Sequence, residues 1–163
     1  MFPLEIETLA RLLVDEARQR SLRIVTAESC TGGLVAGAIC SIAGASDVFE
    51  RGFVTYSNRA KQELLGVPGD LIADMGAVSE PVARMMAEGA LANSNAHVAV
   101  AITGVAGPGG GTRMKPVGTV HIATARANQA VRHREELFEE PSREGVQLAA
   151  AAAALQALRD RMG

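Results

Sequence analysis

Three side chains in the first half of the chain have the chemistry that nucleophilic catalysis needs: Ser46, Tyr56 and Lys61. A serine hydroxyl is a poor nucleophile until a base takes its proton. The histidines are few and lie far apart in the sequence, so the candidates for that base are a lysine, a tyrosine or a carboxylate. Lysine is scarce, because the chain contains only Lys61 and Lys115. Every other cationic side chain is an arginine, whose pKa is too high for it to act as a base near neutral pH.

Two glycine-rich stretches are suited to binding a ligand. The first is Ala27-Glu28-Ser29-Cys30-Thr31-Gly32-Gly33, whose hydroxyls and backbone N–H groups at a helix start suit an anion such as phosphate or carboxylate. The second spans residues 103–112, where many glycines let backbone amides approach a ligand. It is not a Walker loop, because Gly110 stands where that motif requires lysine. A simple helix cap and a flexible loop are the alternative interpretations of the two stretches.

Helices and strands alternate along the elements that must position these residues. Apolar positions at a helical period, with capping and stop signals, predict helices over residues 4–19, 34–39, 58–65, 79–92 and 142–162, and a short helical turn over 48–50. Apolar and β-branched runs predict strands over residues 22–27, 52–57, 97–103 and 117–124. A more polar run over 131–138 predicts an edge strand. We therefore expect one α/β layered domain over residues 1–163, with a central mixed β-sheet flanked by helices.

The composition excludes several classes of function. A chain of 163 residues with a formal net charge of −2 has no field that would attract nucleic acid or an acidic membrane. Four Phe, one Tyr and no Trp leave little surface for stacking bases. With 48% hydrophobic and 21% charged residues, the chain is too apolar for disorder and too interrupted by charge for a membrane protein.

The cysteines and histidines predict neither disulfides nor a metal site. A disulfide between Cys30 and Cys40 would not stabilise a chain of this length, so we expect reduced thiols in a cytoplasmic protein. The three histidines have no metal-binding spacing: His97, His121 and His133. The first residues turn acidic at Glu5 without a basic region and an apolar run, so no signal peptide is predicted.

Five motifs in fixed order resemble the C-terminal domain of CinA, and most closely its stand-alone form, the PncC-type nicotinamide mononucleotide amidohydrolases. They span about residues 5–160: Ala27-Glu28-Ser29-Cys30-Thr31-Gly32-Gly33, Gly52-Phe53-Val54-Thr55-Tyr56-Ser57-Asn58-x-x-Lys61, Gly76-Ala77-Val78-Ser79-Glu80, Thr103-Gly104-x-Ala106-Gly107-Pro108-x-Gly110-Gly111 and Lys115-Pro116-Val117-Gly118-Thr119. The resemblance implies hydrolysis of nicotinamide mononucleotide to nicotinate mononucleotide and ammonia, in pyridine nucleotide salvage, by a Ser/Lys dyad without a cofactor. Longer family members carry an additional N-terminal domain, for which this chain is too short.

Within that resemblance, Lys61 is the base and two serines compete for the role of nucleophile. Ser46 lies 61 − 46 = 15 residues before Lys61, and we expect the intervening strand to fold Lys61 back toward it, so we favour Ser46. Ser29 is then expected to contact the oxyanion or the substrate. Tyr56 is expected to orient Lys61 or to contact the nicotinamide group. A free lysine titrates near 10.4, so burial or a nearby cation must lower that pKa.

The remaining predicted contacts are to the substrate. Thr103 and Gly104 are expected to contact the reacting carbonyl. The phosphate is expected to bind to donors of the two glycine-rich stretches and to one arginine: Thr31, Gly32, Gly33, Gly107, Gly110 and Arg143. The partner is thus a small nucleotide, with no nucleic acid and no membrane, and a homodimer is expected. The alternative is a pyridine-nucleotide-binding module without turnover, linked to competence or the DNA-damage response.

Overall fold

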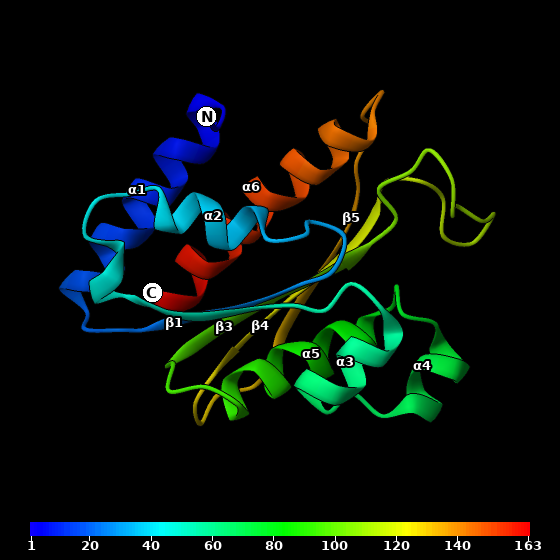
Figure 1. The fold of residues 1–163 in the computed structure, drawn as a ribbon, viewed down its shortest axis with the longest axis horizontal. Coiled ribbons are helices and arrows are strands. Elements are labelled where there is room, and N and C mark those ends of the chain that lie inside the picture. Colours follow the sequence, from blue (N-terminus) through cyan, green and yellow to red (C-terminus); the bar gives the residue numbers. More distant parts are fainter.

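The computed structural model describes residues 1–163 and contains one five-stranded sheet in the order β2-β1-β3-β4-β5 (Figure 1). The strands are β1 (Ile24–Glu28), β2 (Phe49–Val54), β3 (Val98–Gly104), β4 (Thr119–Arg126) and β5 (Arg132–Leu137). β1 runs parallel to both β2 and β3, whereas β4 is antiparallel to its neighbours β3 and β5. The sheet is therefore mixed, as predicted, and β5 is confirmed as an edge strand.

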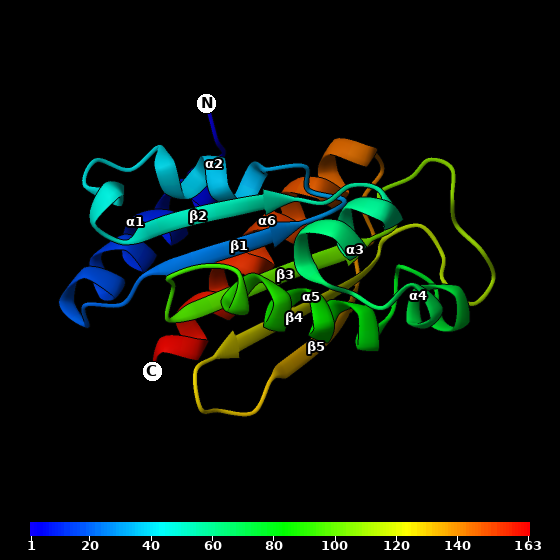
Figure 2. The same ribbon diagram turned by 60° about the horizontal axis from the view of Figure 1, so that its bottom comes forward.

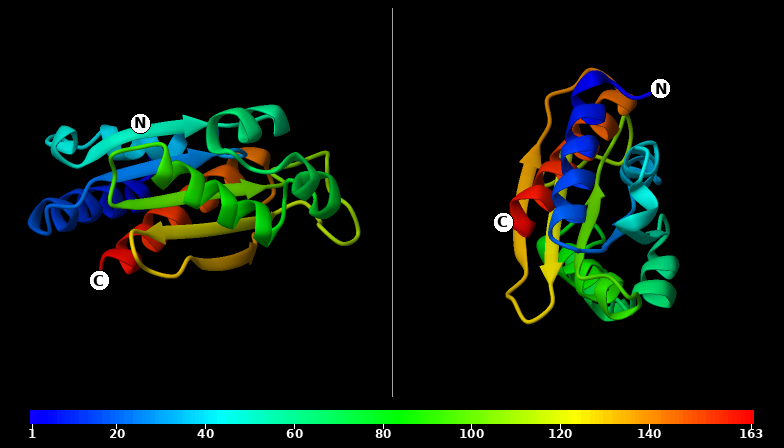
Figure 3. Two further views of the ribbon diagram at one scale, coloured as in Figure 1. Left: turned by 90° about the horizontal axis from the view of Figure 1, so that it is seen from below. Right: turned by 90° about the vertical axis from the view of Figure 1, so that its left-hand side faces the viewer.

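Helices cover both faces of this sheet (Figure 3). One face carries α1 (Leu4–Gln19), α2 (Leu34–Cys40) and α6 (Arg143–Met162). The other carries α3 (Asn58–Leu65), α4 (Gly69–Met75) and α5 (Glu80–Ala92). The predicted layered α/β architecture is confirmed. No helix has both the length and the apolar content that crossing a bilayer requires.

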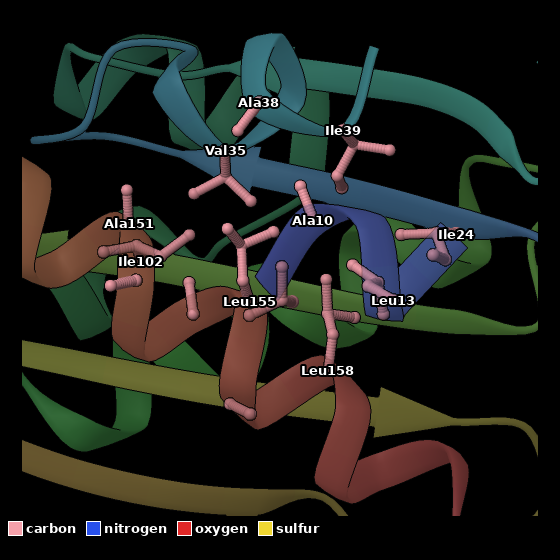
Figure 4. Close-up of a cluster of buried hydrophobic side chains, with 14 of the residues drawn as sticks. Ala10, Leu13, Ile24, Val35, Ala38, Ile39, Ile102, Ala151, Leu155 and Leu158 are labelled. Carbon is pink, nitrogen blue, oxygen red and sulfur yellow. The ribbon is translucent and has the colours of Figure 1, made fainter. Parts of the chain in front are cut away.

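The larger core lies between the sheet and the α1, α2 and α6 layer (Figure 4). Leu13 from α1, Ile39 from α2 and Leu155 from α6 are fully buried there against Ile24 and Ile102 of the sheet. The run of alanines in α6 leaves a smooth surface, so that this helix lies close to its neighbours. Burial of these side chains fixes α6 across the sheet.

The opposite core is narrower, because alanines of β1, β3 and β4 face α5. α5 in turn lies close to α3: a Cβ atom on Gly89 would overlap the carbonyl oxygen of Leu65 at the end of α3. Glycine at this position therefore permits the close approach of the two helices. This contact matters for the site because α3 carries Lys61.

The largest differences from the prediction lie around the start of β2 and at α4. Residues 48–50 are not helical: the short 3₁₀ helix η1 covers Ala45–Asp47, and β2 begins at Phe49 rather than at residue 52. α4 was not predicted, because only seven residues form it and Gly69 opens it. Ser57 caps α3, since its Oγ accepts a hydrogen bond from the Ala60 N–H at 3.0 Å.

The three parallel strands end at the same edge of the sheet, at the right in Figure 2. The loops that follow β1, β2 and β3 therefore meet there. In sheets of this kind, ligands bind beyond the carboxyl ends of the strands. Two of these loops contain the glycine-rich stretches, and the third leads into α3.

Candidate active site

Lys61 and Ser29 meet at the carboxyl end of the parallel strands. Ser29 directly follows β1, and Lys61 lies in the first turns of α3, which β2 places beside it. Lys61 Nζ donates a hydrogen bond to Ser29 Oγ at 2.8 Å, and others to the carbonyl oxygens of Thr55 at 2.8 Å and Tyr56 at 3.3 Å. Only 1% of Lys61 is exposed. The amine is thus held by three oxygens, of which only that of Ser29 belongs to a hydroxyl group.

Burial lowers the pKa of Lys61, so that more of its amine is neutral and able to accept a proton. Desolvation of the charged form lowers the pKa of Lys61 to about 8, and no carboxylate forms an ion pair with it. About a tenth of the side chain is then neutral at pH 7, compared with about one part in several thousand for a free lysine. A neutral amine at hydrogen-bond distance from a serine hydroxyl can remove its proton.

A fully buried carboxylate supports the turn that presents Ser29. Glu28 accepts hydrogen bonds from the Thr31 hydroxyl at 2.6 Å and from the backbone N–H groups of Val35 at 2.9 Å and Ala36 at 3.1 Å. The Glu28 carboxylate thus binds the amino end of α2 from inside the protein. In the sequence, Glu28 stands out only as part of a motif, and no role is predicted for it.

The same contacts bear on the predicted phosphate site in this turn. The Thr31 hydroxyl is buried and already committed to Glu28, and the first free amides of α2 are satisfied by the same carboxylate. Gly32 and Gly33, with φ of 56° and 106°, shape the reversal of the chain. Thr31, Gly32 and Gly33 do not line the cavity at Ser29. The structure thus places these three residues in the turn beneath Ser29 rather than in the cavity lining, and their contact with a phosphate stays a prediction.

A cavity of about 290 Å³ opens in front of Ser29 and Lys61, and we call it the Ser29–Lys61 cavity. Most of the predicted site residues line it: Ser29, Tyr56, Lys61, Thr103, Gly104, Gly107, Gly110 and Arg143. Residues that no single-residue argument had singled out complete the lining: Cys30, Asn58, Ala77, Val78, Val105, Ala106 and Gly109. No group of three or more His, Cys, Asp or Glu side chains is placed to hold a metal ion.

Cys30 lies beside the candidate nucleophile but does not share its chemistry. Burial raises the pKa of the Cys30 thiol to about 12, so the thiolate is scarce at any ordinary pH. Its backbone N–H makes no hydrogen bond with another residue. A free N–H directly after Ser29 is suited to bind the negative oxygen that forms when the serine attacks a carbonyl.

Arg143 bridges two loops at the cavity. Its Nη1 donates to the Gly107 carbonyl at 2.6 Å and its Nη2 donates to the Tyr56 hydroxyl at 2.8 Å. Ser142 caps α6 by accepting from the Gly145 N–H at 3.0 Å, which places Arg143 in the first turn. No carboxylate pairs with this guanidinium, so its charge is available to an anion.

The loop after β3 faces the same cavity with backbone donors. The N–H groups of Ala106, Gly107, Gly109 and Gly110 make no hydrogen bonds within the chain. Together with Arg143 they suit an anionic group of a ligand. The Thr103 hydroxyl, in contrast, donates to the Ala77 carbonyl at 2.9 Å and so fixes the opposite wall of the cavity.

Ser46 is far from this site, which corrects the favoured nucleophile. It is exposed in η1, before β2, whereas Lys61 follows β2. Figure 2 shows the chain entering β2 at one end of the sheet and leaving toward α3 at the other. A six-residue strand spans about 20 Å. The strand therefore separates Ser46 from Lys61 and does not fold the lysine back toward it.

The comparison with known families agrees with the sequence motifs. The model of the CinA C-terminal domain matches residues 6–162. The chain belongs to the CinA C-terminal domain family. Among curated CinA-like proteins, that of Syntrophus aciditrophicus is 45% identical over 160 residues, covering 98% of this chain and 38% of its own. That of Akkermansia muciniphila is 58% identical over 118 residues, covering 72% and 28%. The chain thus spans about a third of these relatives.

Solved CinA-family structures have the same fold over nine-tenths or more of their length. The competence/damage inducible protein CihA from Agrobacterium tumefaciens is 49% identical, with a TM-score of 0.96, and the match covers 98% of this chain and 97% of that one. A CinA superfamily protein from Escherichia coli is 37% identical, with a TM-score of 0.90 and coverage of 96% and 90%. The family and the fold are therefore shown together.

Proposed function

We propose that this CinA-family chain hydrolyses the carboxamide of nicotinamide mononucleotide, giving nicotinate mononucleotide and ammonia. The observation that carries the proposal is the 2.8 Å hydrogen bond between the buried Lys61 amine and the Ser29 hydroxyl. An amide is a stable acyl donor, so its hydrolysis by serine needs a base, an oxyanion donor and an acid for the leaving nitrogen. The Ser29–Lys61 cavity offers a group for each of these tasks.

The first half of the reaction forms an acyl-enzyme. Neutral Lys61 takes the proton of Ser29 as Oγ bonds to the carboxamide carbon, and the carbonyl oxygen becomes negative. The free Cys30 N–H binds that oxygen. The Lys61 ammonium then protonates the amide nitrogen, the carbon–nitrogen bond breaks, and ammonia leaves with the ester to Ser29 in place.

The second half of the reaction uses the same groups in reverse. Lys61 is neutral again and takes a proton from water, whose oxygen attacks the ester carbon. The proton returns to Ser29 Oγ as the carbon–oxygen bond to serine breaks. The carboxylic acid product loses its proton to solvent, so the sum is one amide and one water converted to one carboxylate and ammonium.

The proposed substrate carries one phosphate, and the cavity carries matching donors. Arg143 supplies a positive charge without a carboxylate partner, and the loop after β3 supplies free N–H groups. Tyr56 contacts both cations, since its hydroxyl accepts from Arg143 and its backbone carbonyl accepts from Lys61. We propose that the phosphate binds on this side and directs the carboxamide toward Ser29.

The decisive experiment measures ammonia release from nicotinamide mononucleotide by the purified chain. We expect turnover by the unmodified chain and none by Lys61→Ala. Lys115→Ala is the matched control, because it removes the only other lysine, which lies outside the cavity and donates to the Met75 carbonyl at 2.7 Å. Retention of most of the turnover in Lys61→Ala contradicts the mechanism. Tight nucleotide binding without ammonia release favours the non-catalytic alternative.

A further inference from the structure

A pair of histidines outside the Ser29–Lys61 cavity forms an unusual contact. His121 Nδ1 on β4 and His133 Nε2 on β5 lie 2.9 Å apart, with ring centroids 5.1 Å apart. His133 Nδ1 lies 3.5 Å from the Glu80 carboxylate at the start of α5. Glu80 is an acceptor, so neutral His133 carries its hydrogen on Nδ1 and His121 donates to its Nε2. The three groups thus form a chain of hydrogen-bonding partners from α5 to β4.

This chain of groups abuts the wall of the Ser29–Lys61 cavity at two points. His121 lies opposite Thr103 in the β3–β4 ladder, where facing side chains are neighbours, and the Thr103 hydroxyl holds the Ala77 carbonyl. Glu80 directly follows Val78 and Ser79. Ala77 and Val78 line the Ser29–Lys61 cavity, whereas Val78, Ser79 and His121 line a second cavity of about 520 Å³. Residues 77–79 are therefore the wall between the two cavities.

We propose that His121 and His133 are positioning residues, which hold residues 77–79 against the Ser29–Lys61 cavity and release them when the pair takes up its second proton. The proposal rests on the proposed amidohydrolase only for its effect on turnover. One proton does not break the contact, because an imidazolium still donates to a neutral ring. Two imidazolium rings have no acceptor between them and repel, so one must move.

The charged groups around His121 and His133 affect the protonation of the two rings. From α5, Glu80 favours protonation and Arg84, paired with Glu80 at 2.8 Å, opposes it. Glu135 on β5 favours protonation of both rings, and Lys115 opposes that of His121. Burial, the largest effect, lowers the pKa of both histidines. The rings thus titrate as one coupled pair whose second step lies below the usual range of histidine.

The first measurement follows the wall directly. In two-dimensional NMR spectra recorded from pH 8 to pH 4.5, we expect the backbone amide signals of Ala77, Val78 and Ser79 to shift together with the second titration step of the histidine rings. The double variant His121→Asn, His133→Gln keeps an amide hydrogen bond in place of the ring contact but takes no proton. It should abolish this shift. Arg132→Gln, a β5 change on the opposite sheet face, should leave the shift unchanged.

The second measurement is the pH dependence of kcat/KM for ammonia release. Protonation of Lys61 alone lowers kcat/KM about tenfold per pH unit, and we expect a slope approaching about hundredfold per unit where the second histidine proton binds. The double variant should keep its activity at pH 8 and show the single slope throughout. His133→Ala, which removes the contact, should raise KM at every pH.

Each outcome decides between the two proposals. The positioning role is overturned if the amide signals of residues 77–79 do not shift with the histidine titration. It is also overturned if kcat/KM of the double variant has the same pH dependence as that of the unmodified chain. If the wall amides follow the histidines but no ammonia is released, the positioning role stands and the proposed function fails. A change of the same size in Arg132→Gln attributes the effect to β5 as a whole and also overturns the proposal.

Discussion

Two turns of this chain place a serine near glycine, and they lie at opposite ends of one sheet. The Ser29 turn follows β1 and faces the cavity where three strands end. The Ser46 turn precedes β2 and is exposed. In sequence the two differ little, since each has small residues and hydroxyls. We expect their reactivity to differ, because only Ser29 contacts a buried amine.

The supports beneath the two turns also differ. Under the Ser29 turn, the buried Glu28 carboxylate accepts three hydrogen bonds. The Ser46 turn is held from outside: Arg18 donates to the Gly44 carbonyl at 3.0 Å and lies 3.4 Å from the Asp47 carboxylate, with both side chains largely in solvent. A reactive serine needs a fixed position as well as a base. The first turn supplies both, and the second supplies neither.

The sharpest test of this contrast compares Ser29→Ala with Ser46→Ala. We expect Ser29→Ala to lower kcat for ammonia release by about a thousandfold or more, because the acyl-enzyme cannot form. Ser46→Ala should stay within about twofold, as expected for an exposed side chain outside the cavity. Steady-state kinetics with matched circular dichroism spectra measure both. A large loss in Ser46→Ala with a mild one in Ser29→Ala would reverse the assignment.

A second comparison removes the supports instead of the serines. Glu28→Gln replaces a buried carboxylate that accepts three hydrogen bonds, and we expect the free energy of unfolding to fall by about 2–3 kcal/mol. Asp47→Asn alters an exposed ion pair and should change it by less than about 0.5 kcal/mol. Urea denaturation measures both values. Equal losses in the two variants would show that the buried Glu28 carboxylate stabilises the chain no more than the exposed Asp47 carboxylate does.

Substitution of Arg143 tests whether the Ser29–Lys61 cavity binds the phosphate of the substrate. Arg143→Gln removes the one cavity-lining cation other than Lys61, so we expect KM for the mononucleotide to rise about ten- to hundredfold while kcat changes less. Arg113→Gln is the control, because Arg113 is an exposed arginine in the loop after β3 that does not line the cavity. The difference should vanish for a substrate without phosphate. A fall in kcat alone would place Arg143 with the reacting groups.

The smallest expected effect is a rise in stability with pH. The pKa of Lys61 is about 8 in the folded chain and about 10.4 when unfolded, so the unfolded state binds more protons between these values. The free energy of unfolding should therefore rise by about 1 kcal/mol from pH 8 to pH 9. Lys61→Met should lose this rise.

Cys30 must be removed before that rise is measured. Its thiol has a raised pKa, so the unfolded state ionises first and stability falls with increasing pH above about 9. Denaturation is therefore compared in the Cys30→Ala background, with and without Lys61→Met. A flat pH profile in the Cys30→Ala chain would contradict a lowered lysine pKa.

The sequence was sufficient to predict the layers and most of the elements. Apolar periodicity located α1, the run of alanines with leucines located α6, and the apolar run at β3 correctly indicated a strand covered on both faces. Weak local signals explain the errors at α4 and at the start of β2. The strand Phe49–Val54 contains Glu, Arg and Gly, which obscure a strand pattern, because β2 is an edge strand with exposed positions.

The site was harder to predict, because its geometry is made by pairing far along the chain. Residue types identified Lys61 as a candidate base, and the glycine-rich loop after β3 as part of a binding site. The choice between Ser29 and Ser46 depended on whether β2 runs parallel to β1, which local sequence does not encode. The Glu28 carboxylate was missed for a related reason, since a single glutamate shows its partners only after α2 has folded over it.

Arg143 has a consequence for when the site becomes complete during synthesis. Its hydrogen bonds reach back 87 residues to Tyr56 and 36 residues to Gly107. A ribosome releases the chain from its amino end, so Ser29 and Lys61 emerge long before α6. Until α6 has emerged and docked, the nascent chain lacks the arginine that joins the two loops. A growing chain therefore contains both residues of the candidate dyad before it contains the arginine that would bind an anionic ligand.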